Sequence, residues 1–85
     1  MVKVFVEYKG DLHCELIHEP SQSKIVTDAP VDNQGKGEYF SPTDLVGAAL
    51  GSCIATVMGI YAQRHNIDLK GMKILVEKEM RSEER

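Results

Sequence analysis

Two patterns of apolar residues divide the chain. Up to residue 28, apolar and polar residues alternate in short runs, which is typical of half-buried β-strands. The alternation predicts strands at Val2–Tyr8, Leu12–His18 and Lys24–Asp28. Residues 9–11, Lys-Gly-Asp, favour a tight turn, because Gly10 adopts a positive φ without steric cost. The first two strands are therefore predicted to form a hairpin.

A loop and a long helix follow the strands. Residues Ala29–Phe40 show no period, which predicts a loop long enough to carry function. Ser41 is a suitable N-cap, and Pro42 suits the first helical position because its missing N–H would be unpaired there. Asp44 favours the positive end of the helix dipole. The helix is predicted to run to about His65.

The last part of the chain completes an α+β pattern. Asn66 suits the position just after the helix, and Met72–Met80 alternates again, which predicts a fourth strand. The helix is apolar on all sides, as expected of a helix buried in a core. Four short strands cannot cover it, so we predict a partner chain or a further C-terminal half. We expect residues 1–85 to form a single domain that lacks this C-terminal half.

Composition and charge narrow the class of protein. Leu45–Ala62 has no charge, but its glycines, its hydroxyl groups and the strand-like segments around it favour a core helix over a membrane span. The net charge is -3 and no basic stripe is present, which argues against nucleic-acid binding. No signal peptide is apparent, and two cysteines are too few for a secreted disulfide framework. We therefore predict a cytoplasmic protein with reduced thiols.

Cys53 is the first candidate for chemistry. Its neighbours on the same helix face offer no base: Ala49, Leu50, Thr56 and Val57. An apolar environment alone makes a thiol inert. Cys53 is thus either a small packing residue or a nucleophile activated by a cation from another segment. Cys14, in the second predicted strand, is interpreted as a packed thiol.

Other candidates give weaker patterns. His13, His18 and His65 have no metal-ligand spacing with the cysteines, so we predict no metal site and no cofactor and place these histidines on solvated strand and helix ends. Three loop charges either approach the helix or are simply solvated: Lys9, Asp11 and Glu38. Gly47 and Gly51, spaced i and i+4, predict either packing against the sheet or close helix–helix contact in a dimer.

The run from Gly35 to Glu77 resembles the OsmC/Ohr family of thiol-dependent hydroperoxide reductases. It shows that family's order of a glycine-containing loop, Ser-Pro, and a Leu- and Ala-rich helix with a cysteine, followed by a turn and a strand. The resemblance implies an OsmC-like fold, in which an N-terminal antiparallel sheet wraps a long central buried helix. It also implies an intertwined homodimer with two sites at the subunit interface.

The resemblance implies that Cys53 is a peroxidatic thiolate, which becomes a sulfenic acid and is restored through a disulfide by a dithiol reductant. The family's resolving cysteine, activating arginine and glutamate are not matched: the first arginine is Arg64, and Thr43 follows the proline of the motif. We assign Lys9 and Asp44 as helpers. The predicted function is reduction of organic hydroperoxides in oxidative stress defence. The alternative is a non-catalytic dimer that binds a small molecule, with Cys53 lining its interface pocket.

Overall fold

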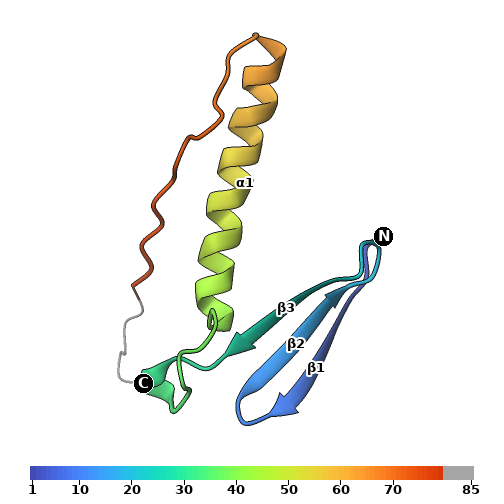
Figure 1. Ribbon diagram of the computed structural model, residues 1–85, viewed down its shortest axis with the longest axis vertical. Helices are drawn as coiled ribbons and strands as arrows, with labels where there is room; N and C mark the ends of the chain where they lie inside the picture. The colour runs from blue at the N-terminus through green and yellow to red at the C-terminus, as the bar shows by residue number, and fades with distance from the viewer. Residues whose placement is uncertain (80–85) are drawn as a thin grey trace. The chain divides into compact units, whose positions relative to one another are not determined.

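The computed structural model of the chain describes residues 1–79. The chain divides into two compact units, Met1–Thr43 and a second that begins at Asp44. The first unit, here called the sheet unit, holds a three-stranded sheet, and the second, the helix unit, holds most of one long helix and the segment that follows it (Figure 1). The predicted α+β class is confirmed. The predicted wrapping of the sheet around the helix stays a prediction.

The three predicted strands are confirmed. They are β1 (Val4–Gly10), β2 (His13–His18) and β3 (Ser23–Asp28), joined as an antiparallel meander in the order β1-β2-β3. The reversal between β1 and β2 uses Gly10 and Asp11, with φ angles of 92° and 56°. This is the left-handed region that glycine enters freely and aspartate tolerates, so the turn follows from the residues placed there.

The register of the sheet places two features that matter for function. The pairing of β1 with β2 shifts between Tyr8 and Gly10, so Lys9 is the extra residue of a β-bulge. In the pairing of β2 with β3, His13 lies directly opposite Asp28. Cross-strand partners in an antiparallel sheet have their side chains within reach of each other. The sheet thus brings an imidazole and a carboxylate together.

The predicted loop from Ala29 to Phe40 is confirmed, with a short 3-10 turn, η1 (Val31–Asn33), within it. The backbone N–H of Asp28 donates a hydrogen bond of 3.1 Å to the carbonyl oxygen of Phe40. The end of β3 and the end of the loop are therefore joined, and the loop closes on itself within the sheet unit.

The helix α1 (Pro42–Arg64) begins at the predicted residue and ends one residue before His65. Asn66 follows with a φ of 56°, and the N–H of Ile67 donates to the carbonyl oxygen of Ala62 at 2.9 Å. A left-handed residue just after the helix and a bond back to its last turn form a common helix stop. The predicted role of Asn66 is confirmed.

The predicted fourth strand at Met72–Met80 is wrong for its described residues 72–79, which join no strand ladder. A strand needs a neighbouring strand to accept and donate its backbone hydrogen bonds. Within the helix unit the segment runs back along α1 instead, and the backbone groups of a helix are already paired with one another (Figure 1). Met80 itself lies outside the described residues.

Within the helix unit, this segment packs on the small-residue track of α1. A Cβ atom added at Gly51 would lie 2.6 Å from Val76 Cγ2, and one added at Gly47 would lie 3.6 Å from Val76 Cγ1. At Gly59 a Cβ would meet nothing within 4 Å among the described residues. The first two glycines therefore make room for the side chain of Val76.

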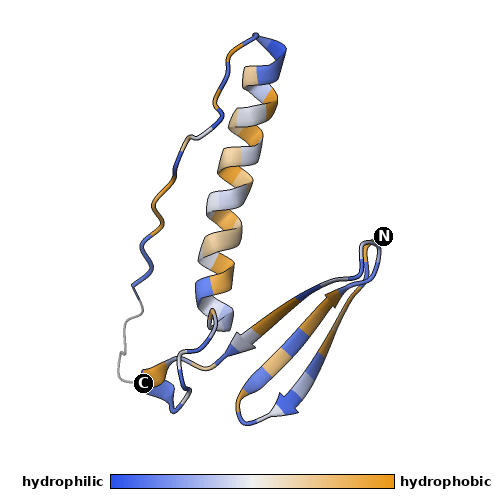
Figure 2. Ribbon diagram, viewed as in Figure 1, coloured by the Kyte–Doolittle hydropathy of each residue, from blue (hydrophilic) through white to orange (hydrophobic). Residues whose placement is uncertain are grey.

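The helix is mostly exposed in the single chain, whereas the sequence predicts it to be buried. Among the described residues of α1 only Gly51 and Ala62 are buried, because the C-terminal segment covers one face of the helix. Apolar residues occur along its whole length (Figure 2). By length and composition alone α1 is also apolar enough to cross a membrane, a test that the core helix of a soluble protein passes too.

Candidate functional site

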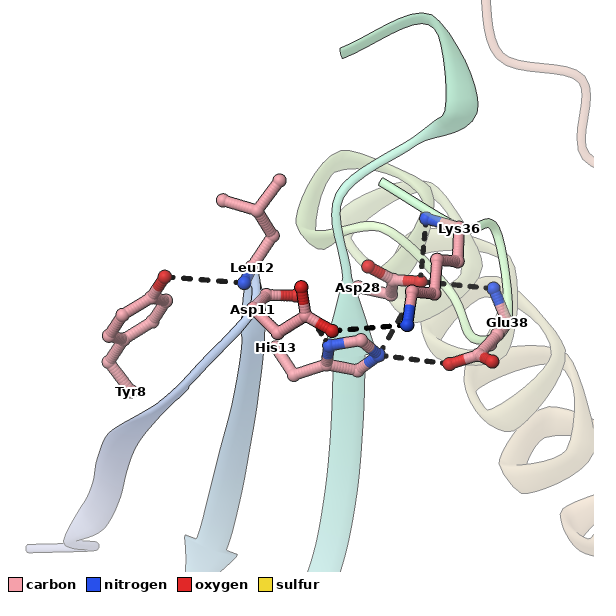
Figure 3. Close-up of polar contacts among 7 residues, drawn as sticks. All are labelled: Tyr8, Asp11, Leu12, His13, Asp28, Lys36 and Glu38. Carbon is pink, nitrogen blue, oxygen red and sulfur yellow. Dashed lines mark hydrogen bonds and ion pairs between the residues drawn. The ribbon is translucent and has the colours of Figure 1, made fainter. Parts of the chain in front are cut away.

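Three side chains from β2, β3 and the following loop converge in the sheet unit: His13, Asp28 and Glu38 (Figure 3). We call them the His13 cluster. His13 Nε2 lies 3.5 Å from Asp28 Oδ2 and 3.1 Å from Glu38 Oε1. One nitrogen and one oxygen from each carboxylate all lie within 4.8 Å of one another. The cluster therefore gathers two acids and one base at a single point.

Asp28 is the buried member of the cluster. Its side chain has an exposed fraction of 0%, and its Oδ2 accepts hydrogen bonds of 3.1 Å from the backbone N–H groups of Lys36 and Glu38. Burial raises the pKa of Asp28. The Glu38 N–H, the charge of His13 and the Lys36 N–H together lower it by a larger amount, so the pKa lies below its ordinary value. Asp28 is thus a carboxylate that ties the loop to the sheet.

The orientation of the His13 ring is set by its other nitrogen. Nδ1 lies 2.7 Å from the carbonyl oxygen of Asp11, and a carbonyl only accepts, so Nδ1 carries a hydrogen and donates it. This bond raises the pKa of His13 above its ordinary value; burial opposes the rise, and Glu38 and Asp28 add to it. The ring also meets Tyr39 edge to face, with centroids 6.0 Å apart.

The prediction that the histidines lie on solvated ends is wrong for His13, whose side chain has an exposed fraction of 16%. The cause is the loop, which folds back over the start of β2. No local pattern of strand residues predicts this path of the loop. His18 and His65 are exposed, as predicted. His18 Nδ1 pairs with Ser21 Oγ at 2.6 Å, close to its own strand.

The predicted loop charges find partners within the sheet unit. Lys9 Nζ lies 3.7 Å from Glu7 Oε1, and both side chains are at least half exposed. Lys36 Nζ lies 3.1 Å from Asp11 Oδ2, and this hydrogen bond and ion pair raise the pKa of Lys36, with smaller contributions from carboxylates of the cluster. Lys9 is therefore an exposed bulge residue with a weak, solvent-screened partner.

Cys53 is a free thiol on an exposed part of α1. Helix residues three, four or seven positions away share its face, since each residue turns the helix by about 100°. Four of these are aliphatic and from 48% to 70% exposed: Val46, Leu50, Val57 and Ile60. With Cys53 they form a continuous apolar surface, here called the Cys53 stripe. The thiol lies at its centre, on the side of α1 away from Gly51 and Val76.

The helix does not bring its predicted acidic helper to its own thiol. Asp44 precedes Cys53 by nine residues, which corresponds to a rise of about 13 Å and about two and a half turns of the helix. The two side chains therefore leave opposite sides of α1. The Asp44 carboxylate instead lies 2.6 Å from Lys78 Nζ, on the segment that returns along the helix.

Comparison with known proteins shows the family of the chain. The family model of OsmC-like proteins matches residues 35–85, which include the cysteine helix and the part of the preceding loop that carries Glu38. The chain belongs to the OsmC-like family. The OsmC-like chain is also 49% identical to a crystal structure from Psychrobacter arcticus 273-4, described as an osmotic stress induced and detoxification response protein, with a TM-score of 0.92.

That match covers 98% of this OsmC-like chain and 61% of the crystallised one, so the chain spans about three fifths of the length of its solved relative. No curated protein sequence matches it. The resemblance to the OsmC family is confirmed by both findings.

Proposed function

We propose that this OsmC-like protein reduces organic hydroperoxides with Cys53 as the nucleophile. The observation that carries the proposal is the position of Cys53: a free, exposed thiol at the centre of an apolar stripe on α1. An apolar surround suits the alkyl part of an organic hydroperoxide. The description of the solved relative as a detoxification response protein supports the same conclusion.

The proposed reaction is a two-electron transfer from sulfur to peroxide. The Cys53 thiolate attacks the terminal oxygen of the hydroperoxide, the S–O bond forms and the O–O bond breaks, and the alkoxide leaves as an alcohol after taking a proton. Cys53 is then a sulfenic acid. A dithiol reductant restores the thiol through a mixed disulfide, and the products are water and the oxidised dithiol. A reducing cytoplasm, the location we propose, supplies such dithiols.

We further propose that the protein acts as a homodimer, with the Cys53 stripe covered at the interface. In the described residues of one chain, Ala62 is the only buried hydrophobic residue, while Leu50 and Val57 are 62% and 60% exposed. Burial of such side chains is the main favourable contribution to association. Lys9 and Asp44 remain proposed helpers, and we expect each to affect the rate less than Cys53 does.

The direct test is peroxide consumption in the presence of a dithiol by the protein and by Cys53→Ser, with Cys14→Ser as the matched control. Loss of the nucleophile is expected to reduce the rate by at least about a hundredfold, because a serine oxygen, unlike a thiolate sulfur, is not oxidised by a peroxide. Cys14→Ser is expected to keep the rate. Equal rates in the protein and in Cys53→Ser would overturn the proposal.

The second candidate is a non-catalytic dimer in which Cys53 only lines a small-molecule pocket. It is favoured by the absence of an arginine before Arg64 and by Thr43 in place of a glutamate after the motif's proline. The two candidates differ in thiolate formation, since a nucleophile needs a lowered pKa. The rate of Cys53 alkylation, measured against pH with Cys14 in the same sample as reference, separates them. Labelling of Cys53 at a lower pH than Cys14 supports the enzyme, and labelling no faster than that of Cys14 supports the binding protein.

A further inference from the structure

When His13 is neutral, the His13 cluster contains more electron-rich atoms than its own hydrogen atoms satisfy. Because Nδ1 of His13 donates to the Asp11 carbonyl, a neutral ring presents the lone pair of Nε2 to Asp28 Oδ2 and Glu38 Oε1. Three acceptors then face one another. Such an arrangement is stable only if a proton on Nε2 or a bound cation lies between them.

We propose that the His13 cluster is a binding site for a divalent transition-metal ion of the zinc class, ligated by His13 Nε2, the Asp28 carboxylate and Glu38 Oε1. Imidazole and carboxylate ligands suit this class of ion. Three protein ligands leave one position of a tetrahedral site for water or another ligand. The site lies wholly within the sheet unit and uses no residue of the proposed thiol chemistry.

The distances fit this type of ion. Ligand bonds of about 2.0–2.1 Å at tetrahedral angles separate neighbouring ligand atoms by about 3.3–3.4 Å. The Nε2–Oε1 and Nε2–Oδ2 separations are 3.1 and 3.5 Å, on either side of that value. Glu38, whose side chain is 54% exposed, has the freedom to adjust its carboxylate to the ion. Two of the three separations therefore match those around a metal ion, and the third, between the two carboxylates, is at most 4.8 Å.

The groups behind the ligands are also those that support metal sites. Ligating histidines generally donate their second N–H to a carbonyl or carboxylate, as His13 does to Asp11. Ligating carboxylates are themselves held by hydrogen bonds, as Asp28 Oδ2 is by the N–H groups of Lys36 and Glu38. These contacts fix two of the three ligands before any ion binds.

One buried atom points independently to a ligand. Asp28 Oδ1 is buried and accepts no hydrogen bond among the described residues; the backbone N–H of Ala29, which also lowers the pKa of Asp28, donates to the carbonyl oxygen of Leu12. A buried polar atom without a partner is rare and calls for an explanation such as a bound ion or water. A metal held by both oxygens of Asp28, or a water bridging the metal to Oδ1, would satisfy this atom.

The competing arrangement is an imidazolium that takes the place of the ion. Lys36, in an ion pair with Asp11, adds positive charge near the cluster. At low pH, one proton on His13 is then enough to balance the remaining negative charge of the two carboxylates. Metal and proton compete for the same lone pair of Nε2. At low pH the ring is protonated, so a metal ion that binds there must displace a proton. Zinc affinity is therefore expected to fall as the pH is lowered.

The test is calorimetric titration of the metal-stripped protein with Zn²⁺ at neutral pH. We expect one ion per chain from the cluster. Affinity is expected to fall at least about tenfold in Glu38→Gln and at least about a hundredfold in His13→Ala. Glu7→Gln and His18→Ala are the matched controls, since each removes an exposed residue of the same type outside the cluster, and both are expected to bind Zn²⁺ like the unchanged protein.

Thiols also bind zinc, so the same titration is made on the variant with both Cys14→Ser and Cys53→Ser. Binding that survives there and shifts the side-chain nitrogen signals of His13, but not those of His18 and His65, supports the site. Glu38→Gln keeps the test open if His13→Ala fails to fold, because Glu38 is exposed. Loss of binding with the cysteines, or binding unchanged in Glu38→Gln and His13→Ala, would overturn the proposal.

Discussion

The sheet unit and the helix unit place their reactive groups in opposite environments. In the sheet unit, the His13 cluster is assembled around a buried carboxylate, Asp28, by strand register and backbone hydrogen bonds. In the helix unit, Cys53 lies on an uncovered apolar face. A polar site can be completed by local hydrogen bonds, because these are directional and short-ranged. An apolar site is completed only when another surface excludes water from it.

The strongest way to test this contrast is to remove one aspartate from each unit. Asp28→Ala leaves the N–H groups of Lys36 and Glu38 without their acceptor, and it removes a buried partner of His13. Asp44→Ala removes a partly exposed pair with Lys78 and an acidic residue from the first turn of α1, each of which is worth about 1 kcal/mol or less. Urea denaturation is expected to show at least twice the loss of unfolding free energy in Asp28→Ala. Equal losses would mean that the buried carboxylate does not hold the loop.

A charge placed in the Cys53 stripe tests whether another chain covers it. Leu50→Glu changes a side chain that is 62% exposed in the single chain, so the fold of one chain should tolerate it. If the stripe forms a dimer interface, the buried charge should weaken association at least about tenfold. Light scattering across a dilution series measures this. Gln63→Glu, an exposed residue at the end of α1, is the control and is expected to leave the mass unchanged.

Two glycines of α1 give a smaller and more local test. In Gly59→Ala the added Cβ meets nothing within 4 Å among residues 1–79, and the helix gains propensity, so we expect about 1 kcal/mol of added stability. Gly51→Ala gains the same propensity, but its Cβ would lie 2.6 Å from Val76 Cγ2, and overpacking of this kind costs about 1–3 kcal/mol. Thermal denaturation should therefore rank Gly59→Ala above the protein and Gly51→Ala below it. The reverse ranking would show that the C-terminal segment does not pack on the track.

The smallest expected effect is the pH dependence of the His13 cluster in buffer with a chelator. The pKa of His13 is raised in the folded protein, so its contribution to stability is complete below its ordinary pKa of 6.5 and is lost as the pH rises through the raised value. Asp28 behaves in the opposite way, and its contribution is lost as the pH falls below 3.8. The charged groups around His13 are Asp11, Asp28, Lys36 and Glu38.

The denaturation midpoint should therefore fall slightly between pH 6 and pH 8, and His13→Gln should remove this slope. With Zn²⁺ in place of the chelator the sign should reverse over the same range, because the metal binds only the deprotonated ring. A slope that is the same in both buffers and in His13→Gln would assign it to other groups.

Much of the fold could be predicted because its signals are local. Alternating residues specify β1 to β3, Gly10 allows the hairpin turn, and the helix limits follow from Pro42 and Asn66. The fourth strand could not be predicted correctly, since alternation specifies a two-faced extended segment but not a strand partner. The OsmC family could be identified because its motif lies within one loop and one helix.

The two candidate sites also differ in how far the sequence predicts them. Cys53 could be proposed from the sequence, because the family motif that the sequence resembles has a cysteine at this place in the helix. The His13 cluster could not, although one signal was present: predicted strands that began near His13 and ended at Asp28 place these residues at the same end of an antiparallel pair. Glu38 gave no such signal, because its position depends on how the whole loop folds back.

The sequence by itself therefore determined the strands, the helix and the family, since each rests on interactions between residues close together in the chain. Only the tertiary structure decided that His13, Asp28 and Glu38 meet and that Val76 occupies the space beside Gly51. These contacts join residues between 10 and 25 positions apart, and their geometry follows from backbone hydrogen bonds and packing that no local pattern records.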